Sequence, residues 1–235
     1  MDKKLRDKQV QILKVFGKYA RDFALSGGTA LELYYLHHRF SADLDFFSPK
    51  YEIKEIEMLI REFKKATGDS VKLHTEFIAS NRARVRFYEA AIKGYSRPLK
   101  MDFVEDTAFK NPSIKKFKGV PVYSVENIYL QKIYAITGGV LGQDEIGREI
   151  TQGRRQARDV FDIYVLSKKI QSLHKFLKAL PMQFQRGMVH WYQTFSRQDL
   201  KLDLLDLDIY DKGFSSRDMI VYLEDEIKKL IKQVL

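Results

Sequence analysis

The sequence predicts an α+β protein, with a small core of strands and helices followed by a C-terminal helical bundle. Three observations support this fold class. Short apolar runs alternate with amphipathic helical patterns at the start, the hydrophobic period changes to two between about residues 71 and 104, and the pattern is helical from Ser124 onward. We therefore expect a core domain over residues 1–120 and a helical domain over residues 121–235.

The composition is that of a globular protein with a basic surface. The chain has 235 residues, of which 45% are hydrophobic, so it can bury a sizeable core. No apolar run approaches the length that crosses a bilayer, and cysteine is absent, which excludes a disulfide framework and Cys-ligated zinc. We expect a cytoplasmic protein without a membrane partner. The net charge of +10 favours a polyanionic partner, although a basic surface alone could produce it.

The first part of the chain alternates between helical and strand patterns. Apolar residues at helical spacing predict a helix over 5–20 with one buried stripe. A short buried strand over 23–25 ends at Gly27-Gly28, and strong helix formers follow over 29–38. The next strand covers 43–47 and stops at Ser48-Pro49, and a helix over 52–66 ends near Gly68.

The middle of the chain reads as strands and its end as helices. We expect strands over 71–78, 82–90 and 97–104, the second with Arg82, Arg84 and Arg86 on its outer face. Polar residues with Pro and Gly over 107–123 favour a linker or a domain boundary. Ser124 can cap a helix that runs through Ile136 to Gly138-Gly139. A loop over 140–153 and four helices complete the chain, at 154–168, 172–179, 182–196 and 215–233.

Three carboxylates and a glycine turn are the candidate chemistry. Asp43 and Asp45 share one face of a strand because successive side chains alternate, and Asp102 lies on another strand with the same alternation. Clustered carboxylates repel unless a cation lies between them, and Mg²⁺ prefers such oxygen ligands. Backbone N–H groups at the Gly27-Gly28 turn could hold a phosphate chain. The alternatives are solvated acids at a strand end and a simple strand-to-helix turn.

These residues resemble a known family. Gly27-Gly28-Thr29-Ala30-Leu31, followed by Arg39-x-Ser41-x-Asp43-Leu44-Asp45-Phe46, closely resembles the AbiEii/AbiGii toxin nucleotidyltransferases of the DNA polymerase β-like superfamily. Asp102, Lys132 and the stretch Arg158-Asp159-x-x-Asp162-x-Tyr164 resemble the later motifs of that family, with about fifteen residues inserted between Gly138 and Gly153. The resemblance implies a minimal nucleotidyltransferase core, a mixed sheet with flanking helices, followed by the helical bundle.

The resemblance also implies a role for each site residue. Asp43 and Asp45 would hold two Mg²⁺ ions, and Asp102 would complete the metal site or act as base toward the attacking hydroxyl. The Gly27-Gly28 turn, with Ser26 or Thr29, would contact the β- and γ-phosphates of an NTP. Further nucleotide contacts would come from Arg39, Lys132 and Asp159.

The later residues have simpler interpretations as well. Lys132 could be a solvated helix lysine, and Asp159 could pair with Arg155 one turn earlier. Arg39 could brace the Asp43-Asp45 strand by pairing with an acid. The pair His37-His38 is explained by cations near a helix C-terminus, and Trp191 by the core of the bundle.

The predicted activity is transfer of a nucleoside monophosphate from an NTP to an acceptor hydroxyl, with Mg²⁺ as cofactor. The acceptor would be a tRNA 3′ end or a protein, and the resemblance implies the toxin of a toxin–antitoxin (abortive infection) pair with a cognate antitoxin. Three basic groups make a nucleic-acid track plausible: Arg82/Arg84/Arg86, Lys115/Lys116/Lys118 and Arg154/Arg155/Arg158. The alternative function is a catalytically silent NTP-binding module of the same fold.

Overall fold

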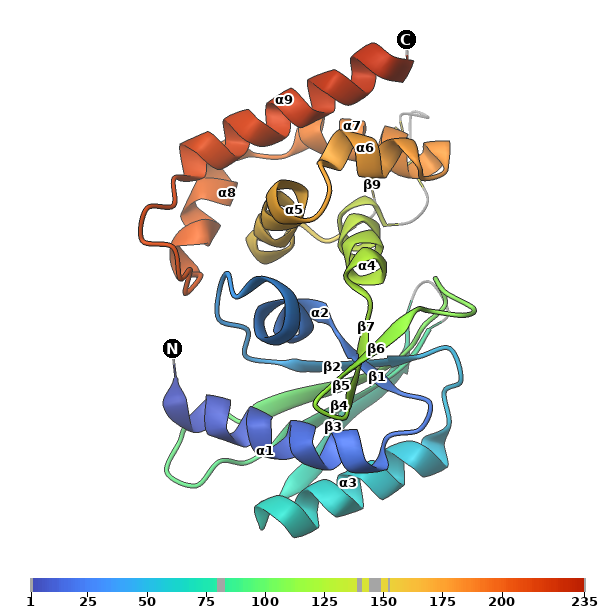
Figure 1. Ribbon diagram of the computed structural model, residues 1–235, viewed down its shortest axis with the longest axis vertical. Coiled ribbons are helices and arrows are strands. Elements are labelled where there is room, and N and C mark those ends of the chain that lie inside the picture. The colour runs from blue at the N-terminus through green and yellow to red at the C-terminus, as the bar shows by residue number, and fades with distance from the viewer. Residues whose placement is uncertain (1, 80–82, 139–140, 144–148, 152, 235) are drawn as a thin grey trace. The chain divides into compact units, whose positions relative to one another are not determined.

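The computed structural model of the chain describes residues 2–79, 83–138, 141–143, 149–151 and 153–234. Contacts divide the chain into two compact units. Figure 1 labels the helices and strands of the chain. The first, here called the sheet unit, comprises Met1–Tyr35 and Phe40–Ile128. The second, the helical unit, comprises Leu36–Arg39 and Tyr129–Leu235. A four-residue segment just before the Asp43-Asp45 strand therefore belongs to the helical unit.

The sheet unit is built on a mixed sheet, as the sequence predicted. Seven strands among the described residues are ordered β3-β4-β5-β2-β1-β7-β6. The pairs β2–β5 and β1–β7 are parallel, and the other neighbours are antiparallel. The strands are β1 (Ala24–Ser26), β2 (Leu44–Ser48), β3 (Val71–Ile78), β4 (Arg84–Ala90), β5 (Leu99–Glu105), β6 (Ile114–Phe117) and β7 (Val120–Tyr123).

Two amphipathic helices cover one face of this sheet. Helices α1 (Lys3–Tyr19) and α3 (Ile53–Thr67) lie side by side beneath the strands in Figure 1. The ring of Phe46 from β2 packs 4.2 Å from that of Phe16 in α1 and 6.3 Å from that of Phe63 in α3, measured between centroids. Because side chains alternate along a strand, Asp45 points to the opposite face. The helix-covered face is the core, and the acids lie on the other side.

The helix after the glycine turn differs from the prediction. It begins at Gly27 rather than at residue 29, with α2 (Gly27–Ala30), and continues as a π-helical segment η1 (Leu31–Leu36). Glu32 in this segment is buried and accepts hydrogen bonds from the main-chain N–H of Ser41, at 2.8 Å, and from Arg6. Wide turns of this kind occur frequently at functional sites.

Residues 107–123 were expected to be a linker or a domain boundary, and the linker is wrong, because much of this stretch is a hairpin of the sheet. Strands β6 and β7 pair through a two-residue turn, Lys118-Gly119, in which both residues have positive φ, 49° and 87°. Such turns match the twist of antiparallel strands. β7 then pairs with β1, Val122 opposite Leu25. β6 lies at the sheet edge and is mostly exposed, so its sequence lacks the alternation that identifies a half-buried strand.

The helical unit contains the C-terminal bundle. Its elements are the later part of α4 (Val125–Thr137), α5 (Ala157–Lys169), α6 (Leu173–Lys178), α7 (Met182–Thr194), α8 (Arg197–Asp203), the 3₁₀ turn η2 (Leu204–Asp206) and α9 (Ser216–Val234). Helix α8 was not predicted. Trp191 is buried and stacks on Phe195, which confirms its place in the core.

The segment between α4 and α5 was expected to be a loop. The structure contains a short antiparallel pair there, β8 (Leu141–Gln143) with β9 (Glu149–Thr151). The rest of the predicted loop, residues 140, 144–148 and 152, lies outside the described residues. In the described part of the chain, no helix combines the length and the apolar character needed to span a membrane.

Candidate active site

The three predicted catalytic acids lie on one face of the sheet unit. Asp45 in β2 and Asp102 in β5 are directly opposite each other on adjacent parallel strands. Asp43 comes just before β2. It is two residues from Asp45, so its side chain points to the same face of the sheet. All three are half-buried. The structure thus brings together carboxylates that are 57 residues apart in sequence, on the face that α1 and α3 leave uncovered.

The glycine turn lies directly against this pair. Gly27 has φ of +69°, a backbone conformation that strongly favours glycine, and a Cβ at this position would stand 2.0 Å from Oδ2 of Asp45. Ser26, the last residue of β1, is opposite Asp45 in the strand register and is fully buried. The turn and the acid strand therefore meet at the N-terminus of the α2–η1 helix, where backbone N–H groups favour an anion.

Thr29 has a role that the sequence did not suggest. Its side chain is fully buried, and its hydroxyl donates a hydrogen bond to the main-chain carbonyl of Asp43. This bond ties the first turn of the helix to the chain that enters β2. The predicted phosphate contact of Thr29 is not tested by this geometry, but the hydroxyl itself has a structural partner.

The donor set of the acid face fits a hard divalent cation. Within the described residues, no three His, Cys, Asp or Glu side chains form a group that could hold a metal ion by themselves. Mg²⁺ does not need one, because it is commonly held by one or two carboxylates together with substrate phosphates and water. Asp45 and Asp102, as adjacent carboxylates beside the glycine turn, match that requirement. Assignment of the metal to Asp43, Asp45 and Asp102 stays a prediction.

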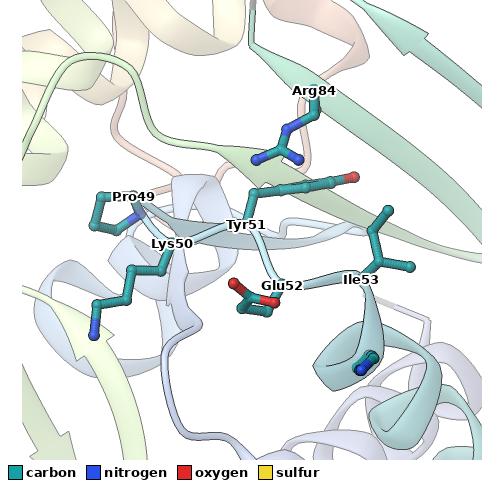
Figure 2. Close-up of a pocket in the computed structure, with 7 residues that line it drawn as sticks. Pro49, Lys50, Tyr51, Glu52, Ile53 and Arg84 are labelled. Atoms are coloured by element: carbon teal, nitrogen blue, oxygen red, sulfur yellow. The ribbon is translucent and has the colours of Figure 1, made fainter.

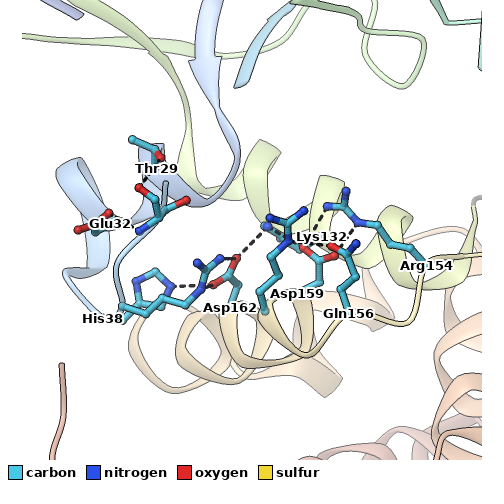
Figure 3. A network of polar contacts seen from close by, with 11 residues as sticks. Thr29, Glu32, His38, Lys132, Arg154, Gln156, Asp159 and Asp162 are labelled. Carbon is cyan, nitrogen blue, oxygen red and sulfur yellow. Dashed lines mark hydrogen bonds and ion pairs between the residues drawn. The ribbon is translucent and has the colours of Figure 1, made fainter. Parts of the chain in front are cut away.

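A second group of predicted residues forms a buried ionic cluster in the helical unit, shown in Figure 3. Its centre is Asp162 of α5, whose side chain is 0% exposed. Arg39 donates to both of its carboxylate oxygens, from Nε at 2.7 Å and from Nη2 at 2.8 Å. His38 Nε2 lies 2.8 Å from Oδ1 of the same residue. Arg39 therefore pairs with an acid, but that acid belongs to α5, and bracing of the Asp43-Asp45 strand by Arg39 stays a prediction.

Lys132 and Asp159 complete the cluster, and both simpler interpretations of them are wrong. Lys132 is buried rather than solvated, and its Nζ lies 2.7 Å from Asp159 Oδ1 and 2.8 Å from Asp162 Oδ2. Asp159 pairs with Lys132 and with Arg154 Nε, at 2.6 Å, rather than with Arg155. Two carboxylates thus neutralise cations from three separate stretches of the chain. The predicted nucleotide contacts of Arg39, Lys132 and Asp159 are not tested by these pairs.

The charges of the cluster follow from its burial and its partners. Burial acts to raise the pKa of Asp162, but the charges of Arg39 and Lys132 and the hydrogen bonds from His38 and Arg39 outweigh it, so the pKa lies well below its usual range. Lys132 and Arg154 likewise overcome burial and lower the pKa of Asp159. Burial lowers the pKa of His38, against the pull of Asp162. His38 is therefore neutral at pH 7, and the sequence interpretation of it as a helix-terminal cation is wrong.

Asp162 was quoted in the family motif but was not selected as a site residue, and neither were His38 and Arg154, although all three belong to this cluster. The signal was present, because Asp159 and Asp162 are three residues apart on a helix and so share one face. Nothing in the sequence alone shows which cations reach that face. Lys132 and Arg39 lie 27 and 123 residues away from their partner acids.

The basic residues of β4 are mostly paired with acids. Arg84 makes a bidentate pair with Glu105, at 2.9 and 3.0 Å, and Arg86 pairs with Glu76 at 3.1 Å. Arg82, the third member of this predicted group, lies outside the described residues. The β4 arginines thus have their charges compensated within the sheet unit, which weakens them as a nucleic-acid track.

An open pocket lies elsewhere on the sheet unit, at the start of α3 (Figure 2). It has a volume of about 410 Å³ and is lined by residues 49–54 and Arg84, whose guanidinium stacks 4.7 Å above the ring of Tyr51. None of the predicted site residues lines it. The hydroxyl of Tyr51 donates a hydrogen bond to the main-chain carbonyl of Phe103 in β5.

Known structures with the same fold come from Helicobacter pylori. A candidate nucleotidyltransferase from H. pylori superposes with a TM-score of 0.62 at 19% identity, over 99% of both chains. JHP933 from Helicobacter pylori superposes with a TM-score of 0.61 at 21% identity, over 100% of this chain and 96% of that one. At this identity the likeness establishes the fold. Comparison with curated protein sequences finds no significant match.

The family is established by a sequence comparison. The model of the family described as "Nucleotidyl transferase AbiEii toxin, Type IV TA system" matches residues 11–226. This range contains the glycine turn, the three acids and the buried cluster of α5. The chain is therefore a nucleotidyltransferase and belongs to the AbiEii toxin family of type IV toxin–antitoxin systems.

Proposed function

We propose that the protein transfers a nucleoside monophosphate from an NTP to an acceptor hydroxyl, with release of pyrophosphate and dependence on Mg²⁺. One observation carries this proposal. The adjacent carboxylates Asp45 and Asp102 lie on one face of the sheet, and the Gly27 turn touches the first of them. A phosphate at the turn would thus be next to the carboxylates that hold its counter-ion.

Each residue has a role that its position allows. The N–H groups of Gly27 and Gly28 bind phosphate oxygens at the helix N-terminus, where Gly27 leaves room beside Asp45. Asp43 and Asp45 hold the cation, and Asp102 shares it or accepts the proton of the attacking hydroxyl. Bound Mg²⁺ would neutralise charge on the transferring phosphoryl group.

The acceptor and the biological setting are proposed from the family. We take the acceptor to be a tRNA 3′ end or a protein side chain, and the partner to be a cognate antitoxin that restrains the enzyme. The net charge of +10 supports a polyanionic acceptor. The alternative is a module that binds NTP without transferring it, and retention of all three acids on one face argues against that alternative.

The test is a labelling assay. Wild type and Asp43→Ala/Asp45→Ala are incubated with each labelled NTP and Mg²⁺, first with total tRNA and then with total protein. The matched control is Asp203→Ala/Asp206→Ala, which removes two exposed acids of the helical unit. Loss of the metal-binding acids should reduce transfer by at least about a hundredfold, since a bound cation contributes several kcal/mol to the reaction.

The result separates the two functions. Label on an acceptor with wild type and the control, but not with the Asp43/Asp45 variant, supports the enzyme. NTP binding without label on either acceptor class would contradict the proposed transfer and support the silent module.

A further inference from the structure

The strand register places a line of side chains across the acid face of the sheet. Ser26 is opposite Asp45, Asp45 is opposite Asp102, Asp102 is opposite Phe87, and Phe87 is opposite Thr75. Residues opposite each other point to the same face, so these side chains form one row from β1 to the edge strand β3. The glycine turn is at one end of this row, and an aromatic side chain is next to the acids on the other side.

The next row on the same face adds a second aromatic ring. Phe77 in β3 is opposite Val85 in β4, two residues along from the Phe87 row. The rings of Phe77 and Phe87 meet edge to face, with centroids 5.3 Å apart. Phe87 is half-buried, and Phe77 is 41% exposed although it is a large apolar side chain. Here Phe77 and Phe87 are called the aromatic pair.

The geometry of phosphoryl transfer indicates from which side of the acids the acceptor approaches. The attacking and leaving oxygens lie roughly in line on opposite sides of the phosphorus. If the triphosphate lies at the glycine turn, pyrophosphate leaves toward β1, and the acceptor hydroxyl must approach from the side of β5 and β4. The side chain next to Asp102 on that side is Phe87. The aromatic pair therefore lies where the acceptor arrives.

We infer that the aromatic pair is the acceptor-binding platform of this enzyme, on which an unpaired base of a single-stranded nucleic acid stacks. Aromatic rings hold unpaired bases of any sequence, whereas a paired base has both faces covered by its neighbours. Two lysines on the same face supply positive charge that suits the phosphate backbone of a nucleic acid. Lys100 and Lys72 are exposed and flank Glu89 in the row on the other side of Asp102.

The inference rests on the proposed function, because it takes the acids as the reaction centre. It is nevertheless tested by binding alone. The probe is a 5′-fluorescein oligoribonucleotide of about eight nucleotides, within the usual site size, with a free 3′-hydroxyl. Its anisotropy is followed with wild type, Phe77→Ala and Phe87→Leu. The same oligonucleotide in a blunt duplex is the second probe.

Leu73→Ala is the matched control. Leu73 is in the same strand as Phe77 and is 47% exposed, but it is opposite Tyr88 and so points to the other face. Phe77→Ala removes an exposed side chain and Phe87→Leu keeps an apolar one, so both variants should fold, which circular dichroism checks. We expect roughly five- to hundredfold weaker binding of the single strand by each Phe variant, as for the loss of one base–aromatic stack.

Each outcome decides the question. Weaker single-strand binding by the two Phe variants, with Leu73→Ala like wild type and the duplex bound less tightly, supports the platform. Unchanged binding by Phe77→Ala and Phe87→Leu overturns it. It is also overturned if the two variants lose only the labelling of a protein acceptor, or only self-association measured by sedimentation. Absence of transfer by wild type would refute the proposed function, and the binding result would still decide the inference.

Discussion

Gly27 and Asp45 are in such close contact that a single added carbon at Gly27 would stand 2.0 Å from the carboxylate oxygen Oδ2. This proximity joins the two halves of the proposed chemistry, the phosphate turn and the metal-binding strand. It also makes Gly27 the most demanding position of the site. Its φ of +69° already disfavours any other residue, and the neighbouring carboxylate leaves no room for a side chain.

Gly27→Ala should therefore abolish NMP transfer. The substitution forces Asp45 away from its position, and the strained backbone costs about 1–2 kcal/mol of stability. Transfer is measured by the labelling assay and stability by urea unfolding.

Gly68→Ala separates the two effects. Gly68 ends α3 with a similar φ of +67°, but a Cβ there would meet nothing within 4 Å. We expect Gly68→Ala to lose a similar amount of stability and to keep its activity. Equal activity of the two variants would show that contact with Asp45 does not matter.

Much of the fold could be predicted because its sequence signals are local. Strand β3 has the predicted bounds of 71–78, and α3 ends at the left-handed Gly68 as expected. The β6–β7 hairpin was missed because an exposed edge strand has no buried face, and so its sequence carries no alternation. The change from α- to π-helix at Leu31 was missed because the strong helix formers of this stretch predict a helix without indicating how wide its turns are.

The same distinction applies to the site. Alternation alone placed Asp43 and Asp45 on one face, and the register of β2 with β5 brings Asp102 beside them. The partners of Lys132 and Arg39 could not be predicted, because an ion pair between distant segments leaves no spacing in the sequence. Burial decides their roles, since a lysine or arginine in the core requires a carboxylate.

Asp162→Asn should destabilise the protein by about 3–5 kcal/mol, the cost of leaving buried charges without their partner. Arg39, Lys132 and His38 all contact this carboxylate, and an amide can accept from only some of them. Urea unfolding at pH 7.5 measures the change. Asp203→Asn, at an exposed position of α8, is the control and should change stability by less than about 0.5 kcal/mol. A small loss of stability in Asp162→Asn would mean that water reaches the cluster and replaces the missing carboxylate oxygen.

Stability should fall as the pH drops below about 6.5. Burial lowers the folded-state pKa of His38 from 6.5, so between the two values the unfolded chain binds the extra proton and unfolding is favoured. A second loss of stability should begin below about pH 3.8. There the unfolded chain binds protons at Asp159 and Asp162, whereas the lowered pKa values keep both carboxylates ionised in the folded state. Urea midpoints are compared at pH 7.5, 6.0, 5.0 and 3.5.

His38→Gln tests the first of these losses, because glutamine can still donate to Asp162 but does not titrate. The decline between pH 7.5 and 5.0 should become shallower in this variant and remain in His74→Gln, which removes an exposed histidine of β3. If His38→Gln keeps the full slope, another group causes it.

Mg²⁺ and a non-hydrolysable NTP analogue together should raise the melting temperature of wild type, because a ligand that binds only the folded state stabilises it. At a hundredfold excess over the dissociation constant, the gain is about 2.7 kcal/mol, or roughly 5–10 °C for a chain of this size. Asp45→Asn should lose most of this shift, since it removes the carboxylate that Gly27 and Asp102 adjoin. Asp203→Asn should keep it. EDTA should reduce the rise in the melting temperature of wild type to that given by the analogue alone. A full rise in EDTA, or in Asp45→Asn, would show that the triphosphate binds without the acid face.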